Sequence, residues 1–291
     1  MNYQDILTKA SKGLKNLKGN VIDVVEVKKP PTLDYARHLA KIVSKLSPLV
    51  GNMIEYHVCV ELNKLDWGEV GSWKRQDPGF PDTVFEGNIN PAPGIEIKTW
   101  FPLATEITAR FKDSINHFKQ NQTYVALLAW LPEFIIYGKP KIIDVWVDTA
   151  WSLAKARDAH YHRPPDYLIF EPENTSERAA NLQQSNTNGY KFQGDAKAFQ
   201  EAEKIVAAWG KEGKRYSPSR SYQKKLRQLR GKYPYRLDTN YAKIDRIGHQ
   251  GVENFKTHVL DSVIHQHSLR EWSKLIKDEE WKTMDWIKNL M

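Results

Sequence analysis

Asp82, Glu96 and Lys98 occur within residues 79–100 at a spacing that suits metal-assisted chemistry. Asp82 follows a proline, and thirteen residues separate it from Glu96, which is followed two positions later by Lys98. Side chains alternate along a β-strand, so a strand over residues 95–100 would place Glu96 and Lys98 on one face. Converging carboxylates suit a hard divalent cation, and a neighbouring lysine suits a water nucleophile or a phosphate oxygen.

The same segment is expected to form a β-hairpin. Residues 80–85 are a short run rich in β-forming residues, residues 86–88 carry turn chemistry, and residues 95–100 alternate. Pairing of the two strands would bring Asp82 beside the Glu96 carboxylate. The alternative is a solvated Glu-x-Lys pair on an exposed strand face, which is the usual fate of such charges.

The Pro-Asp dipeptide at 81–82, the thirteen-residue interval and the Glu-Ile-Lys tripeptide at 96–98 together resemble the signature of the PD-(D/E)XK nuclease superfamily. This superfamily includes many type II restriction endonucleases. The sequence Gly-Ile-Glu-Ile-Lys-Thr at 94–99 is especially similar to the catalytic strand of the methyl-directed mismatch-repair nicking endonuclease and its restriction-enzyme relatives. The resemblance covers roughly residues 50–170 and does not extend to the C-terminal third.

The resemblance implies a restriction-endonuclease-like α/β fold, in which a central mixed β-sheet is flanked by helices. It also implies that Asp82 and Glu96 bind Mg²⁺, with the Ile97 carbonyl as a further ligand. Lys98 would then orient or deprotonate the attacking water. Members of the superfamily usually leave a 5′-phosphate and a 3′-hydroxyl.

The interval between the two carboxylates departs from the family pattern. It is long, and prolines stand at 91 and 93 in addition to the one at 81. The register of Asp82 is therefore open, and Asp77 or Glu86 could take its place.

A third carboxylate, Glu55, is expected near the start of a helix. Residues 51–65 hold apolar side chains on most faces, which is typical of a buried helix, and Asn52 can cap its N-terminus. The spacing Asn52-x-x-Glu55 is that of a capping box, so Glu55 could bond back to the Asn52 amide. The related nucleases instead carry a carboxylate beside the metal on the helix before the catalytic hairpin. Glu61 is the fallback for that role.

Composition favours a polyanionic partner. The 291 residues carry a formal net charge of +8 and a sequence pI of about 9.2, a balance that suits nucleic acid. The single cysteine, Cys59, permits no internal disulfide and no cysteine-based zinc site, which fits a reducing cytoplasm. The sequence has neither a hydrophobic signal segment nor a run of about eighteen apolar residues, so we expect neither secretion nor a membrane span.

Positive charge is concentrated in residues 211–236, where ten Lys or Arg residues accompany one acid, Glu212, and four interleaved tyrosines. A solvated face is the ordinary interpretation of such a run, whereas cations with interspersed hydroxyls also suit DNA phosphates and base edges. An expected basic helix at residues 106–120 is open to the same two interpretations. The residues expected to contact DNA are Arg110, Lys112, Lys214, Arg215, Arg220, Lys224, Lys225, Arg227 and Arg230.

The remaining patterns predict an α/β core followed by a helical, basic region. Strands and helices alternate in the first part of the chain, which favours a mixed sheet. Helices are expected over residues 1–18, 32–47, 149–160 and 195–209, and strands over residues 21–27, 124–131, 141–147 and 167–170.

The polar segment 171–194 suggests a boundary. We therefore expect two regions: a catalytic core with N-terminal helices in residues 1–185 and a helical, DNA-contacting region in residues 186–291. His160 and His162 are interpreted as loop or DNA-facing residues. Residues 240–291 are expected to be helical, with core or dimer contacts made by Trp272, Trp281 and Trp286.

The resemblance, together with the basic composition, implies a Mg²⁺-dependent, sequence-specific endonuclease that cuts double-stranded DNA, most simply a cytoplasmic, homodimeric type II restriction enzyme. A repair nickase or junction resolvase with the same site is one alternative. The other is a non-catalytic DNA-binding protein in which Glu96 and Lys98 are surface charges.

Overall fold

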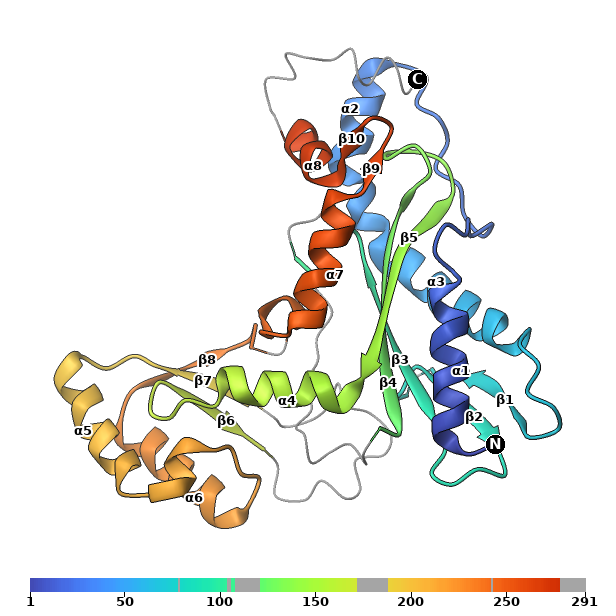
Figure 1. Cartoon of the computed structure of the whole chain (residues 1–291). Coiled ribbons are helices and arrows are strands. Elements are labelled where there is room, and N and C mark those ends of the chain that lie inside the picture. Colours follow the sequence, from blue (N-terminus) through green and yellow to red (C-terminus); the bar gives the residue numbers. More distant parts are fainter. Residues whose placement is uncertain (78, 104–105, 108–120, 172–187, 242, 278–291) are drawn as a thin grey trace.

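A computed structural model of the chain describes residues 1–77, 79–103, 106–107, 121–171, 188–241 and 243–277 (Figure 1). It contains a five-stranded sheet whose strands lie in the order β1-β2-β3-β4-β5. Strands β3 and β4 are parallel and the other neighbours are antiparallel, so the expected mixed sheet is confirmed. The strands are β1 (Gly71–Arg75), β2 (Thr83–Gly87), β3 (Gly94–Trp100), β4 (Thr123–Pro132) and β5 (Pro140–Thr149).

Helices cover both faces of this sheet. Figure 1 shows α1 (Tyr3–Lys15) and α3 (Ser47–Asn63) on one side and α7 (Gln250–Asp261) on the other. Helix α4 (Ala150–Tyr161) leaves the end of β5 on the same side as α7. The arrangement is an α/β fold with flanking helices, as the sequence predicts. β4 is buried along nearly its whole length because it lies between two strands and two helical layers.

The N-terminal elements follow local signals. Asn2 and Asp5 form a capping box at the start of α1. Helix α2 (Leu33–Ile42) is capped by Thr32 and continues as a 3₁₀ turn, η1 (Val43–Leu46), so the helix expected over 32–47 is present in two parts.

The strand expected over residues 21–27 is wrong. A turn at Asp23 and Val24 interrupts the segment, so its backbone pairing consists of isolated bridges. These bridges join Val21 to Lys141 and Val27 to Gly138.

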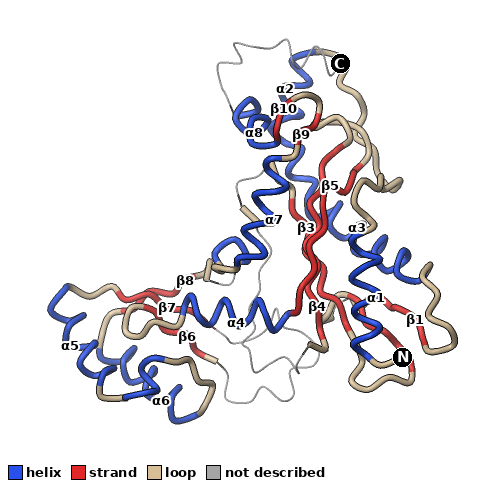
Figure 2. Tube along the Cα trace, viewed as in Figure 1, coloured by secondary structure: helices blue, strands red, loops and turns tan. Residues whose placement is uncertain are grey.

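A smaller lobe lies at the far end of α4, as Figure 2 shows. Its sheet has the order β6-β7-β8, with β6 (Tyr167–Phe170), β7 (Asn188–Phe192) and β8 (Tyr235–Asp238). Helices α5 (Ala196–Ala207) and α6 (Arg220–Lys232), joined by the 3₁₀ turn η4 (Gly210–Lys214), complete the lobe. Because β6 precedes residue 185, strands from both sides of the expected boundary form one sheet.

The side chains of β6 point alternately into the cores of the two lobes. Leu168 and Phe170 face the core formed with α5 and α6, whereas Tyr167 and Ile169 belong to the core of the main sheet. The smaller lobe therefore packs against the main one through one face of its own sheet.

The C-terminal part returns to the main lobe. A short hairpin of β9 (Val263–Ile264) and β10 (His267–Ser268) joins α7 to α8 (Leu269–Lys277). Trp272 is buried there and its Nε1 donates to the Ile264 carbonyl at 2.7 Å, which confirms a core role. Trp281 and Trp286 lie outside the described residues. No helix in the described ranges is long and apolar enough to cross a membrane.

Candidate active site

The β2–β3 hairpin brings Asp82, Glu96 and Lys98 together. Thr83 is paired with Ile95, so Asp82, just before β2, lies beside the middle of β3. Lys98 Nζ lies 2.5 Å from Glu96 Oε1 and 3.5 Å from Asp82 Oδ2. Both carboxylates thus converge on one ammonium group, and all three side chains are less than one-fifth exposed.

Main-chain hydrogen bonds hold the two carboxylates in this arrangement. The Asp82 amide donates to Glu96 Oε2 at 3.2 Å, and the Ile97 amide donates to Asp82 Oδ2 at 2.6 Å. Each carboxylate is therefore fixed by the backbone of the opposite strand as well as by Lys98. This explains how a short sequence motif produces one defined geometry.

Gly94 allows this close approach of the two strands. A Cβ atom at this position would lie 2.2 Å from Pro81 Cγ, well inside the contact distance of two carbon atoms. Pro81 packs directly on the glycine, and its neighbour Asp82 is carried to β3. The glycine, the proline and the aspartate of the motif are thus linked by packing.

The three charges perturb one another. Burial raises the pKa of Glu96 to about 7, an effect that the Lys98 charge opposes and the Asp82 charge reinforces. Burial acts to lower the pKa of Lys98, but the carboxylates of Glu96 and Asp82 outweigh it and raise that pKa above its usual value. Lys98 is therefore a charged ammonium at neutral pH.

Glu55 does not belong to a capping box. α3 begins at Ser47, with Pro48 in its first turn, so Asn52 and Glu55 lie inside the helix. The Asn52 side chain instead donates to the Pro48 carbonyl at 3.1 Å. The capping interpretation of Glu55 is therefore wrong, because the helix starts one turn earlier than the sequence suggested.

Arg75, on β1, holds Glu55 beside the site and was missed in the sequence. Its Nη2 lies 3.2 Å from Glu55 Oε2, and its Nη1 lies 2.9 Å from Asp77 Oδ2. Burial and the charge of Asp82 raise the pKa of Glu55, whereas Arg75 and Lys98 lower it. Glu55 thus shares one electrostatic environment with the hairpin. The alternation around the buried Trp73 was the available signal for β1.

The carboxylates considered as alternatives to Asp82 and Glu55 pair with other cations. Asp77 is bound by Arg75 and its side chain is 64% exposed. Glu86 pairs with Lys74 at the far end of β2, and Glu61 lies 2.5 Å from Lys64 Nζ. Asp82 is the carboxylate that meets Glu96 and Lys98.

The donor set fits a hard divalent cation. Extending the β2–β3 register sets Pro81 opposite Ile97, and proline has no N–H to donate to the Ile97 carbonyl. That carbonyl lies on the same strand edge as the Ile97 amide, which faces Asp82. Two carboxylates and a carbonyl are oxygen ligands of the kind Mg²⁺ prefers. No cluster of three or more His, Cys, Asp or Glu side chains at metal-binding distance is found in the described part of the chain.

The expected DNA-contacting residues differ in their environments. Lys214, Arg215, Arg220, Lys224 and Arg227 are exposed. Tyr222, Leu226 and Leu229 pack the opposite side of α6 into the core of the smaller lobe. Arg110 and Lys112 lie outside the described residues.

Lys225 and Arg230, both expected to contact DNA, make contacts within the protein. Lys225 Nζ lies 2.5 Å from Glu212 Oε2. The Arg230 guanidinium lies 4.2 Å from the centre of the Tyr190 ring, in a cation–π contact that packs it on β7.

His162 is not a DNA-facing residue. It is 9% exposed, and its Nε2 lies 2.5 Å from the Tyr222 hydroxyl. Burial lowers the pKa of His162 to about 4, so its ring is neutral at pH 7. His160, by contrast, is exposed.

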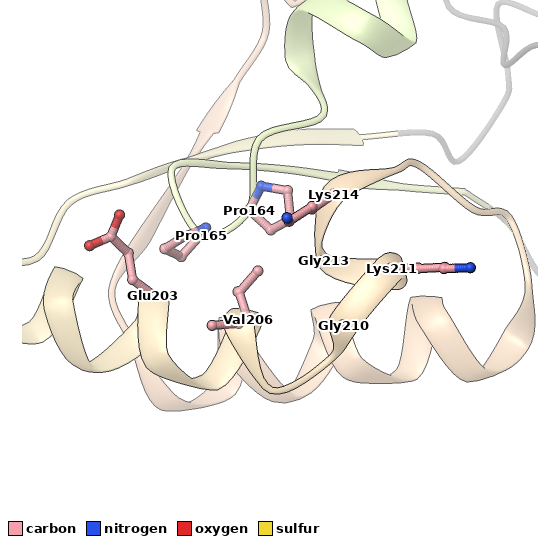
Figure 3. A pocket seen from close by; sticks show the side chains of 9 residues that line it. Pro164, Pro165, Glu203, Val206, Gly210, Lys211, Gly213 and Lys214 are labelled. Carbon is pink, nitrogen blue, oxygen red and sulfur yellow. The ribbon is translucent and has the colours of Figure 1, made fainter.

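Two cavities flank Lys214 in the smaller lobe. Figure 3 shows the first, of about 570 Å³, which Pro164, Pro165 and Val206 line with apolar surface. The second, of about 360 Å³, lies between α4 and the segment before α6 and is lined by charged and aromatic side chains. Both volumes fall in the range of small-molecule sites.

Comparison with known proteins assigns this chain to no group. No protein-family model, curated protein or solved structure matches it. Its function therefore has to be inferred from the geometry and charges of its own residues.

Proposed function

We propose that this protein is a Mg²⁺-dependent DNA endonuclease of the PD-(D/E)XK type, most simply a type II restriction enzyme that acts as a homodimer on double-stranded DNA. The observation that carries the proposal is the convergence of Asp82 and Glu96 on Lys98, at 3.5 and 2.5 Å. These are the residues on which the sequence resemblance rests. The five-stranded mixed sheet with flanking helices is compatible with a restriction-endonuclease-like core.

A purely structural salt bridge explains the site poorly. Taking charges out of water costs several kcal/mol per ion, and apolar residues of similar volume often serve stability better. Two neighbouring sets of ion pairs, Asp82 and Glu96 on Lys98 and Glu55 and Asp77 on Arg75, each have two carboxylates and one cation, which gives a formal charge of −1 for each set. Such an excess favours a divalent cation.

The residues would divide the hydrolysis of a phosphodiester between them. Asp82, Glu96 and the Ile97 carbonyl would hold Mg²⁺. When bound, the ion supplies Lewis-acid stabilisation of the phosphate and an acidified water. A water oxygen would attack phosphorus as the bond to the 3′ oxygen breaks. The water would lose a proton to solvent and the 3′ oxygen would gain one, so that a 5′-phosphate and a 3′-hydroxyl remain.

Lys98 and Glu55 support that step from two sides. Because its pKa is raised, Lys98 acts as an ammonium that orients the water and offsets charge on the phosphate oxygens. Glu55, held by Arg75, would accept a hydrogen bond from a bound water or take part in a second metal site. Burial and the charge of Asp82 outweigh the contact with Arg75 and keep the pKa of Glu55 above its usual value.

Helix α6 supplies a surface for the DNA backbone. Arg220, Lys224 and Arg227 are exposed and follow one another at four- and three-residue spacing, which places them on one side of the helix. Such a row suits successive phosphates, and Arg can also read guanine edges. The formal net charge of +8 suits the same partner.

Digestion of a sequenced supercoiled plasmid tests this proposal. We expect discrete double-strand fragments with Mg²⁺, with 5′-phosphate ends on mapping, and no cleavage with EDTA. Ca²⁺ should support DNA binding without cleavage, because its looser coordination positions the water poorly. Nicked circles alone would favour a repair nickase. DNA binding without cleavage under any divalent metal would leave a non-catalytic DNA-binding protein.

A further inference from the structure

The cavity between α4 and the segment before α6 has a polar floor and a cationic rim. Asp158 and His162 form its floor and are 6% and 9% exposed. Lys155, Lys214 and Arg215 line it and are exposed, so their charges stand at the entrance. The cavity therefore presents different chemistry at its two ends.

The floor is part of a buried network of charged side chains. Arg157 donates through Nε to Asp158 Oδ1 at 2.9 Å and through Nη2 to Glu171 Oε1 at 3.2 Å. Two buried carboxylates thus share one guanidinium. A carboxylate offers about four acceptor positions, so Asp158 can accept from a ligand as well as from Arg157.

Aromatic rings form the walls. The rings of Tyr216 and His162 meet edge to face, with centroids 5.4 Å apart. Burial and the neighbouring carboxylates raise the pKa of Tyr216, and burial lowers that of His162, so both rings are uncharged at neutral pH. Neutral rings beside a hydrogen-bond acceptor suit a flat, polar, aromatic ligand.

We propose that this cavity binds one nucleotide extruded from DNA, with its base against Tyr216, an amino group of the base toward Asp158 and its phosphate on Lys214 and Arg215. The cavity volume of about 360 Å³ lies within the range of small-molecule sites. Arg215 and Tyr216 lie in the short segment between η4 and α6, whose exposed row of cations would hold the adjoining backbone. The DNA source rests on the proposed function, whereas the fit to a nucleotide rests on the cavity alone.

Free nucleotides give the first test, by calorimetric titration in EDTA so that no DNA chemistry is involved. We expect dAMP, dCMP and dGMP to bind at least about fivefold more tightly than dTMP, which has no exocyclic amino group. Removing the phosphate, as in deoxyadenosine, should weaken binding and abolish its salt dependence. Binding by none of the four nucleotides, together with no preference in the DNA test, would overturn the proposal.

Four variants locate the binding. Tyr216→Ala should weaken nucleotide binding at least about fivefold through loss of stacking. Arg215→Ala and Lys214→Ala should weaken dAMP but not deoxyadenosine. They alter exposed residues, so they remain informative if Tyr216→Ala fails to fold. Lys204→Ala removes an exposed charge of α5 outside both cavities and should change nothing; equal losses in Lys204→Ala and Arg215→Ala would overturn the assignment.

DNA with one unpaired nucleotide distinguishes the two sources. A duplex containing a single extra adenine should bind wild type more tightly than the fully paired duplex, because the cost of extrusion is lower. Arg215→Ala and Tyr216→Ala should lose that preference. If free nucleotides bind but the two duplexes bind equally well, the cavity would be assigned to a free nucleotide instead. A protein that shows both effects and cuts no DNA would retain this site while the nuclease proposal fails.

Discussion

Lys98 stands between two carboxylates, and its environment limits what it can do. Its raised pKa means that removing its proton at neutral pH is unfavourable while Asp82 and Glu96 are charged beside it. An ammonium donates hydrogen bonds and offsets negative charge, but it does not accept a proton. Of the two roles implied by the sequence, orientation of the water therefore agrees better with this site than deprotonation.

At Glu55, charge and fold can be separated by one substitution. Glu55→Gln removes the charge but keeps the shape, and Arg75 retains its contact with Asp77. We predict that cleavage falls at least about tenfold, equivalent to 1.4 kcal/mol of barrier, with little change in melting temperature. The matched control is Glu61→Gln on the same helix, where the partners are Lys64 and His57. Equal cleavage by the two variants would assign Glu55 a structural role.

The site residues that belong to the hairpin motif could be predicted from the sequence. Strand alternation placed Glu96 and Lys98 on one face. The resemblance to the nuclease motif then singled out Asp82. Arg75 could not be named, because its partner Glu55 is twenty residues away and lies on a different element. The error over Asn52 arose because a proline at 48 already starts α3.

At the scale of elements, the site depends on how closely β2 approaches β3. Gly94→Ala would place a Cβ 2.2 Å from Pro81 Cγ, which forces Pro81 and Asp82 away from Glu96. A displacement of 1 Å can cost about 100-fold in rate, and we predict a loss of that order. Gly231→Ala, whose Cβ would meet nothing within 4 Å, is the control. Wild-type kinetics in the folded Gly94→Ala protein would contradict this role of Gly94.

Helix α6 yields a prediction about salt dependence. Changing Arg220, Lys224 and Arg227 together to Ala should reduce the slope of log affinity against log salt by up to about 2.7, from about 0.9 per phosphate contact. Arg230→Ala is the contrast, because Arg230 packs on Tyr190. It should lower the melting temperature and leave the slope near that of wild type. Filter binding at several salt concentrations gives both slopes, and an unaltered slope in the triple variant would place the DNA elsewhere.

Sequence patterns predicted the long strands and the short strand β6, but not β7 and β8. The strands expected over residues 124–131 and 141–147 are present as the ten-residue strands β4 and β5, whose apolar residues were recognisable in the sequence. β7 and β8 have five and four residues, and they are stabilised by partners far away in sequence. Local patterns carry little information on such contacts.

At the scale of the whole molecule, α4 carries the chain from the main sheet into the smaller lobe (Figure 1). His162, its C-cap, touches Tyr222 of α6 through a hydrogen bond. Burial of this histidine makes the association of the lobes sensitive to acid. The pKa of His162 falls from 6.5 to about 4 on folding.

Because burial lowers the pKa of His162, the stability of the protein should depend on pH. A folded pKa below the unfolded one adds stability above pH 6.5, and this stability is lost as pH falls from 6.5 towards 4. The effect amounts to about 3 kcal/mol at most. Thermal melts of wild type and His162→Gln should therefore converge as pH falls through this window. A stability difference that is independent of pH would exclude titration of His162 as the cause.

The central claim, that the hairpin carboxylates serve metal-dependent cleavage, is tested most directly by the cleavage rates of two variants with Mg²⁺. Glu96→Gln removes a carboxylate that converges on Lys98, whereas Glu86→Gln changes an exposed glutamate of the same hairpin that pairs with Lys74. We predict that Glu96→Gln loses at least about 100-fold in rate, equivalent to about 2.7 kcal/mol, while still binding DNA. Glu86→Gln should stay within about twofold of wild type. Equal rates for the two variants would contradict the account.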